Sequence, residues 1–391
     1  MDTYALDFET YYDKECSIAT LGPLGYFNHP SFDAYMVSVV GDEGTEFVGH
    51  PKDFDWNLLG GNRVLSHNAS FDETLYLFGV REGLWDSTNY AEWHCTADLC
   101  AFCDLPRSLK GASQELFNLE VSKETRNMML GKRWESMDDD FKKEVLDYAL
   151  KDSQLCLQVW QKLSDLWPQV ERDISRVNRK IVQRGIPIDA ELLKSQQEEI
   201  TKLRFETENK IPWIQESPIL SRKAFNEECR KNNIKPPASL ALSRDEANIW
   251  IDNYTEEFPW VSSVRDYRRI NALKRKLDSF DFATMPDSRY YGGLMYMGAH
   301  TGRFSGRGGN LNLQNLPRGE MFGVDLRSLI APQESHKLIV ADLSQIEVRT
   351  LCWLAQDWDT LEEIKNSDDI YEAFAIRFGK WDRNSGVLKK E

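Results

Sequence analysis

The stretch Tyr4-Ala5-Leu6-Asp7-Phe8-Glu9 lies close to the start of the sequence and predicts a strand with bounds Thr3–Phe8. Residues i and i+2 of a strand point to the same face, so Asp7 and Glu9 lie side by side. Two such carboxylates on a buried strand repel each other and lose hydration unless a cation neutralises them. The segment therefore predicts a cation-binding pair, although the same spacing is also common on protein surfaces.

The residues that follow alternate between strand-like and helix-like patterns, which predicts an α/β sheet domain over residues 1–165. We expect a mainly helical region over 166–289, and a third region over 290–391 that begins with a glycine-rich segment. The other expected strands are Ala34–Val40, Thr45–Val48, Arg63–Ser66 and Lys337–Ala341, and the expected helices are Asp72–Leu77, Cys95–Cys103, Ser108–Leu116, Phe141–Leu163, Arg172–Val182, Ala190–Asn209, Trp260–Asp278 and Val348–Ala355.

Two further segments bring acidic side chains toward the same sheet domain. Asn68-Ala69-Ser70-Phe71-Asp72 follows an apolar strand and places Asp72 at the start of a helix, where an aspartate is equally an ordinary N-cap. Tyr148 and Asp152 are four residues apart on a predicted helix and share one face. By itself the second pair is also what an amphipathic helix with an exposed aspartate contains.

In this order, the three segments resemble the DEDDy exonucleases of the ribonuclease H-like fold. The resemblance implies two Mg²⁺ ions that carry out hydrolysis of a phosphodiester, with Asp7 as the bridging ligand. It also implies that Tyr148 and Glu9 orient the attacking water, with tyrosine where another branch of the family has histidine, and that Asn68 contacts the substrate. The implied metal ligands are Asp7, Glu9, Asp72 and Asp152.

The residue types agree with that chemistry. One ion lowers the pKa of the water, and the other stabilises the leaving 3'-oxygen. Magnesium prefers carboxylate oxygen and keeps several waters, so no histidine or cysteine ligand is required, and Mn²⁺ is an alternative ion. A tempting zinc cluster, His94 with Cys95, Cys100 and Cys103, lacks a second C-x-x-C pair, and its spacing fits positions in a core helix.

A second resemblance lies further along the chain. His300-Thr301-Gly302-Arg303-Phe304-Ser305, Asn312–Arg318 and Ala341–Arg349 closely resemble three successive motifs of family A DNA polymerases. Asp266–Ile270 and the basic Lys274–Lys276 are similar to the helix that follows duplex DNA in this family. The resemblance implies a thumb at 166–289 and the first part of a palm, with the start of the fingers, at 290–391.

The second resemblance also implies roles for individual residues. Asp342 is a candidate metal ligand at the nucleotide site, and Glu347 matches the position that disfavours a 2'-hydroxyl. Arginine suits contacts to phosphate and base edges because its donors form a fixed fork. The implied DNA contacts are Arg268, Lys274, Arg303, Gln314, Asn315 and Arg318.

The sequence lacks two motifs that a complete family A polymerase carries. We find no fingers helix with its lysine and tyrosine, and no second palm aspartate, after Asp342. One carboxylate does not hold a two-metal site, so we expect these 391 residues alone not to polymerise. A truncated protein, an interrupted gene and a split polymerase completed by a second polypeptide remain open, as does a free-standing exonuclease similar to ribonuclease D that acts on RNA.

The distribution of charge along the chain is compatible with metal ions and nucleic acid as partners. The net charge is −15 over residues 1–170, +4 over 171–320 and −4 over 321–391. Carboxylates gathered around metal ions and basic residues gathered around phosphates give such a distribution, although acidic surfaces also serve solubility alone. We expect single-stranded 3' ends and primer–template duplex as partners, and no membrane. The seven scattered cysteines suit a reducing cytoplasm, which would be the host's if the protein is a bacteriophage one.

Overall fold

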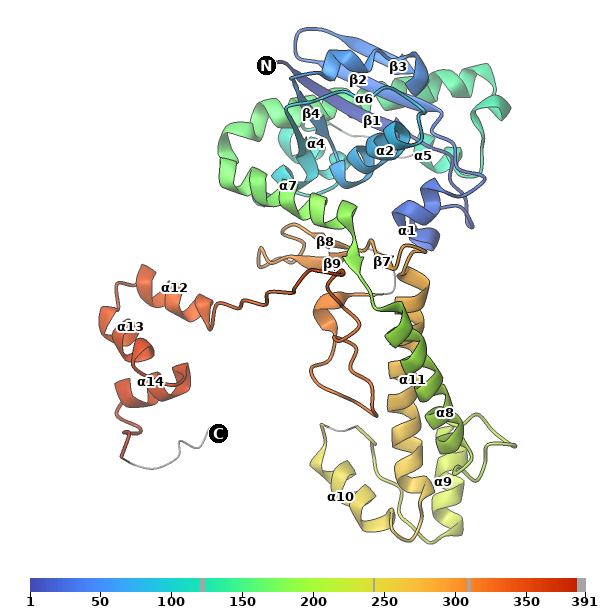
Figure 1. Ribbon diagram of the computed structural model, residues 1–391, viewed down its shortest axis with the longest axis vertical. Helices are drawn as coiled ribbons and strands as arrows, with labels where there is room; N and C mark the ends of the chain where they lie inside the picture. Colours follow the sequence, from blue (N-terminus) through green and yellow to red (C-terminus); the bar gives the residue numbers. More distant parts are fainter. Residues whose placement is uncertain (120–123, 242, 308–310, 385–391) are drawn as a thin grey trace. The chain divides into compact units, whose positions relative to one another are not determined.

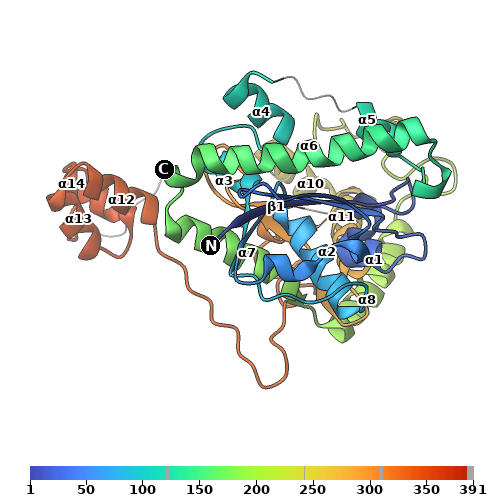
Figure 2. The same ribbon diagram turned by 90° about the horizontal axis from the view of Figure 1, so that it is seen from above.

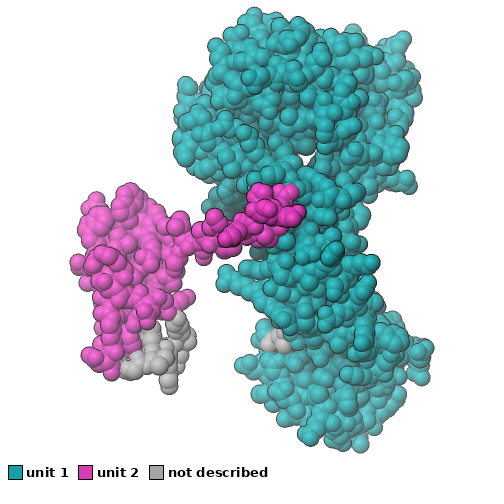
Figure 3. Space-filling model, viewed as in Figure 1, with its two compact units in different colours: residues 1–331 teal, residues 332–391 magenta. Residues whose placement is uncertain are grey.

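A computed structural model describes residues 1–119, 124–241, 243–307 and 311–384. It divides the chain into two compact units, Met1–Ala331 and Pro332–Glu391, which are shown in different colours in Figure 3 and are described separately below. Within the described ranges, every helix is too short or too polar to cross a membrane.

The first unit begins with a mixed five-stranded sheet, which confirms the predicted α/β class (Figure 1). The strand order is β3-β2-β1-β4-β5. The central strand β1 pairs with β2 in the antiparallel sense and with β4 in the parallel sense. The strands are β1 (Thr3–Glu9), β2 (Met36–Gly41), β3 (Glu46–Gly49), β4 (Arg63–Ser66) and β5 (Glu92–Cys95).

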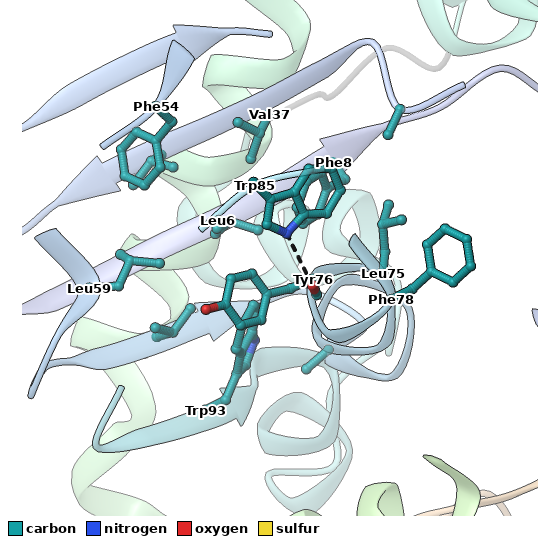
Figure 4. Packing of buried hydrophobic residues seen from close by; sticks show 14 of the residues in the cluster. Leu6, Phe8, Val37, Phe54, Leu59, Leu75, Tyr76, Phe78, Trp85 and Trp93 are labelled. Atoms are coloured by element: carbon teal, nitrogen blue, oxygen red, sulfur yellow. Dashed lines mark hydrogen bonds between the residues drawn. The ribbon is translucent and has the colours of Figure 1, made fainter. Parts of the chain in front are cut away.

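The side chains of β1 alternate between two layers of helices. Figure 2 shows α6 (Asp139–Leu163) on one side of β1 and α2 (Ala69–Arg81) on the other. Leu6 and Phe8 point into a core on the α2 side, which is rich in aromatic rings (Figure 4). In that core the Trp85 Nε1–H donates to the Tyr76 carbonyl oxygen over 3.0 Å. The odd-numbered residues of β1 consequently face α6.

The four helices predicted around the sheet are all confirmed with shifted ends, whereas the strand β5 and the helices at Ile18–Phe27 and Glu124–Met129 were not predicted. The predicted helix Cys95–Cys103 is preceded by the unpredicted strand β5. The helix α1, in which Gly22 adopts a positive φ of 68° before Pro23, was not predicted either. The remaining helices of this part are α1 (Ile18–Phe27), α3 (Thr96–Phe102), α4 (Leu109–Phe117) and α5 (Glu124–Met129), with short 3₁₀ turns at Pro51–Asp53, Trp56–Leu59, Trp134–Ser136 and Ser164–Leu166.

The rest of the first unit is mainly helical, as predicted. The helices α8 (Ala190–Glu208) and α11 (Trp260–Ala283) pack along each other and share one core with the segment 311–330. A second core, around Trp213 and Trp260, joins α9 and α10 to the start of α11. The elements are α7 (Gln169–Arg184), β6 (Ile186–Pro187), α8 (Ala190–Glu208), α9 (Arg222–Lys231), α10 (Asp245–Tyr254), α11 (Trp260–Ala283), β7 (Arg289–Tyr290), β8 (Gly293–Met295), β9 (Ser305–Arg307) and a 3₁₀ turn at Leu313–Asn315.

Helix α7 is joined to the sheet by a buried polar network. The Arg179 guanidinium is only 1% exposed; its Nε–H donates to Glu73 over 2.9 Å, and it also donates to the Trp93 carbonyl oxygen. The Ser175 hydroxyl donates to Asp98 over 2.6 Å. Buried ions of this kind persist only where every charge is paired. The network therefore fixes how α7 lies against α2 and β5.

The second unit contains α12 (Ile346–Leu354), α13 (Trp358–Lys365) and α14 (Ile370–Arg377), which share a small core around Cys352 and Ile364. Helix α12 confirms the helix predicted at Val348–Ala355. The predicted strand Lys337–Ala341 is wrong in this structure, because these residues are extended without a pairing strand in the described part of the chain. A strand requires a neighbour to satisfy its backbone groups.

The exposed apolar segment Leu338–Val340 predicts that the chain associates with itself. Ile339 is 92% exposed and Val340 is 91% exposed. Contiguous exposed apolar surface favours association because contact removes it from water. We expect sedimentation velocity to show concentration-dependent association, and an Ile339→Asp/Val340→Asp variant to reduce it, whereas Ser335→Asp does not. A clean monomer at every concentration of the unmodified chain would contradict this expectation.

Candidate active site

The sheet domain contains a cavity of about 610 Å³ that is lined by all the acidic residues singled out in the first 170 residues. Asp7 and Glu9 come from β1, on the face that turns toward α6. Asp72 comes from the first turn of α2, and Asp152 from α6 together with Tyr148. Three elements distant in sequence thus deliver four carboxylates and one phenol to one cavity.

Hydrogen bonds hold these elements in place. The backbone N–H of Phe8 donates to Asp72 Oδ1 over 3.2 Å, which ties α2 to β1. Ser38 stands opposite Asp7 in the β1–β2 register, and its hydroxyl donates to the Ala149 carbonyl oxygen over 2.8 Å. The Ser38 and Ser153 hydroxyls are 2.6 Å apart. Because both contacts lie next to Tyr148 and Asp152 in sequence, they fix the part of α6 that faces Asp7.

The electrostatics of the cavity favour a bound cation. Burial, followed by the charges of Asp72, Glu9 and Asp152, raises the pKa of Asp7 well above its usual range. Burial and the Asp152 charge raise the pKa of Glu9 to about 8. Burial alone raises the pKa of Asp72 to about 8 and that of Asp152 to about 6. Carboxylates that resist ionisation in this way ionise readily once a divalent ion compensates them.

The donor set fits Mg²⁺ or Mn²⁺ because its acidic groups offer only oxygen atoms. Among the described residues, however, no three aspartate, glutamate, histidine or cysteine side chains stand in an arrangement that holds a metal ion. Ion binding would therefore have to draw the carboxylates together by rotation of their side chains.

Sequence reasoning missed a cationic residue in this cavity. Arg126 of α5 lines the cavity, and its charge lowers the pKa values of Asp7, Glu9 and Asp152, against the effect of burial. The Tyr12 hydroxyl donates to the Arg126 carbonyl oxygen over 2.6 Å, which anchors this short helix near β1. No motif marks Arg126, because only the tertiary fold brings α5 to the carboxylates.

Two further residues that line the cavity are Asn68, which has an unusual backbone conformation, and His67, which has a neutral ring. Asn68, which was singled out as a substrate contact, lines the cavity and caps α2 in a left-handed conformation with φ of 103°. Asparagine tolerates this conformation better than most residues, and such conformations are frequent at binding sites. Burial lowers the pKa of His67 to about 4, so its ring is neutral between Thr96 and the Arg107 carbonyl oxygen.

The raised pKa values predict how stability depends on pH without metal. The folded protein keeps protons on these carboxyls at pH values where the unfolded chain, with pKa values near 4, has lost them. Stability from this source is complete below pH ~4 and is lost as pH rises toward 8. We expect the melting temperature in EDTA to fall between pH 5.5 and 8.5, and Mg²⁺ to reduce the fall. A melting temperature with the same pH profile in EDTA and Mg²⁺ would contradict this prediction.

The residues of the second resemblance are distributed over both units. In the first unit, Arg268 and Lys274 lie on α11, and the Lys274 Nζ–H donates to Asp278 over 2.8 Å. Arg303 lies between β8 and β9, where the Gln314 amide donates to the Phe304 carbonyl oxygen over 3.3 Å. Asn315 and Arg318 follow Gln314 and are exposed. In the second unit, Asp342 precedes α12 and Glu347 lies in its first turn, and both are exposed.

Comparisons with known proteins match this second set of residues. Residues 251–386 match the model of DNA polymerase family A, a range that contains every polymerase-type residue named above. Over these residues the chain resembles the family A DNA polymerases. It is 22% identical over 440 aligned residues to a DNA polymerase of Bacillus phage SP02, which covers 97% of this chain and 65% of that protein. It is 27% identical over 256 residues to a thermostable DNA polymerase I of Thermus filiformis, covering 61% of this chain and 30% of that one.

A solved structure extends the likeness to the fold of the chain. The POL domain of Pol1 from M. smegmatis, in complex with a DNA primer–template and dNTP, matches with a TM-score of 0.62 and 16% identity, covering 99% of this chain and 65% of that one. The chain thus spans about two thirds or less of each of these relatives. The family model itself leaves out residues 1–250, which supply all four carboxylates of the cavity.

Proposed function

We propose that residues 1–165 form a metal-dependent 3'→5' exonuclease that removes nucleotides from single-stranded DNA, carried by a family A polymerase chain. One observation supports the proposal above all: four carboxylates, of which Asp72 is buried and the others are partly buried, line one cavity together with Tyr148 and come from three elements. The strand order β3-β2-β1-β4-β5, with α6 against β1, is compatible with the ribonuclease H-like domain that the sequence resemblance implies. Like-charged carboxylates buried together are costly for folding and indicate a functional site.

The protein groups have separate tasks in this proposal. Asp7, Glu9, Asp72 and Asp152 would hold two Mg²⁺ ions, which supply an activated water and neutralise the leaving oxygen. Burial and the Asp152 charge keep the pKa of Tyr148 far above its usual range, so its hydroxyl stays protonated and acts by orienting the water rather than by taking its proton. Glu9, beside Tyr148 in the cavity, would accept a hydrogen bond from the same water.

Arg126 would bind the phosphate that is cleaved. Its guanidinium lines the same cavity, and its charge lowers the pKa values of Asp7, Glu9 and Asp152. We expect Arg126→Ala to lower kcat/KM on single-stranded DNA by roughly 100-fold, because a charge-assisted phosphate contact is lost. Arg126→Lys should recover part of the loss, and Lys143→Ala, at an exposed position of α6, should change nothing. An unchanged kcat/KM for Arg126→Ala would contradict this role.

For the polymerase motifs we propose duplex DNA as the ligand. Arg268 and Lys274 on α11, and Arg303 with the segment Gln314–Arg318, would contact primer and template, while Asp342 and Glu347 would belong to a deoxynucleotide site. One carboxylate cannot hold two ions, so polymerisation would need a further carboxylate supplied from outside these residues, on the same or on a second polypeptide.

The substrate and the direction of degradation test the exonuclease proposal. The purified chain is incubated with Mg²⁺ and oligonucleotides of one sequence, as DNA and as RNA, each labelled at the 5' end. The proposal predicts a ladder that shortens from the 3' end, faster on DNA. Faster degradation of RNA would favour an enzyme similar to ribonuclease D, and immediate release of labelled mononucleotide would indicate the opposite direction.

A further inference from the structure

Helix α7, which Figure 1 shows between the sheet domain and β8, buries polar side chains and exposes apolar ones. Its buried residues are Ser175, Asn178 and Arg179, and each of them is hydrogen-bonded. On its outer side, Val170 is 61% exposed and Val177 is 52% exposed. A helix that only covers a domain has the reverse arrangement, with apolar residues inside. The fold of the first unit thus gives no reason for the outer side of α7.

Four exposed residues of α7 form one continuous row, which we call the α7 stripe. It consists of Val170, Ile174, Val177 and Ile181. Their spacing of four, three and four residues is that of the seam of a coiled coil, where such positions face a second helix. Valine and isoleucine are poorer helix formers than lysine, glutamate or glutamine, so an exposed helix position gains nothing from them. The stripe therefore has the character of a contact surface.

Two opposite charges border the stripe on the same side of the helix. Asp173 lies near the start of the stripe, where Arg176 is 2.7 Å from its carboxylate, and Lys180 is exposed about two turns later. If two copies of α7 pack in the antiparallel sense, Ile174 of each copy lies opposite Val177 of the other. Asp173 then lies opposite Lys180, twice by symmetry. In a parallel pair these two charges would be about 10 Å apart along the axis and could not meet.

We propose that the α7 stripe binds the α7 stripe of a second copy of this chain, in antiparallel orientation around a two-fold axis. Charge complementarity favours a second copy, because one helix carries both signs and the two-fold axis brings them together. Each helix is already ordered by its own domain, so little conformational entropy is lost on association. Two helices of 16 residues bury less than the ~1,600 Å² of a standard interface, and we expect a Kd on the order of 10 µM.

The contact leaves the carboxylate cavity open, since no residue of the α7 stripe lines that cavity. The buried network of Ser175 and Arg179 lies on the other side of α7 and is not part of the contact. One dimer therefore carries two separate cavities, each accessible to its own ligand.

Sedimentation velocity of the full chain over a concentration series tests the contact. It is carried out on the unmodified chain and on Ile339→Asp/Val340→Asp, in which association through the segment Leu338–Val340 is reduced. In both, Val177→Glu should raise the Kd of the dimer at least about 100-fold, because the contact would bury an unpaired charge. Gln161→Glu adds the same charge at an exposed position of α6 and should leave the Kd unchanged. Melting curves establish that each variant is folded.

Exchange of the two charges tests the orientation. Asp173→Lys and Lys180→Asp should each raise the Kd about tenfold, because each puts like charges opposite one another. The double variant Asp173→Lys/Lys180→Asp should restore the Kd, since opposite charges then face each other again. Failure of the folded double variant to recover would overturn the antiparallel arrangement.

Cross-linking locates the two-fold axis. A short bismaleimide should link two copies of Val177→Cys, which lie close to the axis, and should not link two copies of Ile181→Cys, which are about 15 Å apart along the helix. A link through Ile181→Cys would show a parallel contact instead.

Two further results would overturn the proposal. A dimer that persists in Val177→Glu would lie elsewhere on the chain, and a monomer well above the expected Kd would mean that the stripe serves a different protein. None of these measurements uses nuclease activity, so their outcome is independent of the proposed exonuclease.

Discussion

Asp7→Asn is expected to lower the rate of single-stranded DNA degradation by at least roughly 1,000-fold, since this carboxylate is the proposed ligand shared by both ions. The change keeps the size of the side chain and removes its charge. Asp147→Asn is a matched control because Asp147 is exposed on α6, beside Tyr148 in sequence, and does not line the cavity. Initial rates at saturating Mg²⁺ give the comparison directly.

The Asp7→Asn variant also distinguishes a loss of catalytic activity from a loss of folding. Burial and three neighbouring carboxylates oppose the charge of Asp7 in the absence of metal. In EDTA at pH 8, Asp7→Asn should therefore increase the free energy of unfolding, by at least about 1 kcal/mol. An inactive variant that is also less stable than the unmodified chain in EDTA would mean that Asp7 serves the fold rather than the reaction.

Arg179→Met is expected to cost about 3–5 kcal/mol of unfolding free energy, the largest effect on stability that we predict, because it leaves Glu73 buried without its cation. Glu73 is 3% exposed, and its other contact is the Tyr90 hydroxyl, which donates to it over 3.1 Å. Urea unfolding followed by circular dichroism measures the loss.

The double variant Glu73→Leu/Arg179→Met is the control for this prediction. It removes both charges, so it should recover most of the stability lost in Arg179→Met. Arg176→Met, on the partly exposed side of α7, should have an effect below about 0.5 kcal/mol. If Arg179→Met were as mild as Arg176→Met, the buried network would not be what fixes α7 to the sheet.

The parts of the site that could be predicted from sequence depend on short-range geometry. The period of two along β1 puts Asp7 and Glu9 on one face, and the helical spacing puts Tyr148 and Asp152 on one face. These pairs required no knowledge of the rest of the fold, and the structure places all four residues in one cavity. The domain boundaries proposed from sequence, the metal ions and the activity itself remain predictions.

The parts that could not be predicted depend on tertiary contacts. Strand β5 has four residues, Glu92–Cys95, and its His94 is buried against Trp160, so neither length nor alternation marks it as a strand. Helix α1 contains Gly22 and Pro23, which usually interrupt a helix. The apolar run Leu338–Ala341 has the composition of a strand but no neighbour in this structure. Arg126 was missed for the same reason, since its position near the carboxylates arises only on folding.

The most direct test of the central claim, that this cavity is a divalent-metal nuclease site, is a Mn²⁺ titration of the metal-free chain followed by electron paramagnetic resonance of the free ion. Our account predicts tight binding of up to two Mn²⁺ ions per chain, competition by Mg²⁺, and strong weakening in Asp7→Asn but not in Asp147→Asn. Binding that is absent, or that is unchanged in Asp7→Asn, would contradict the account.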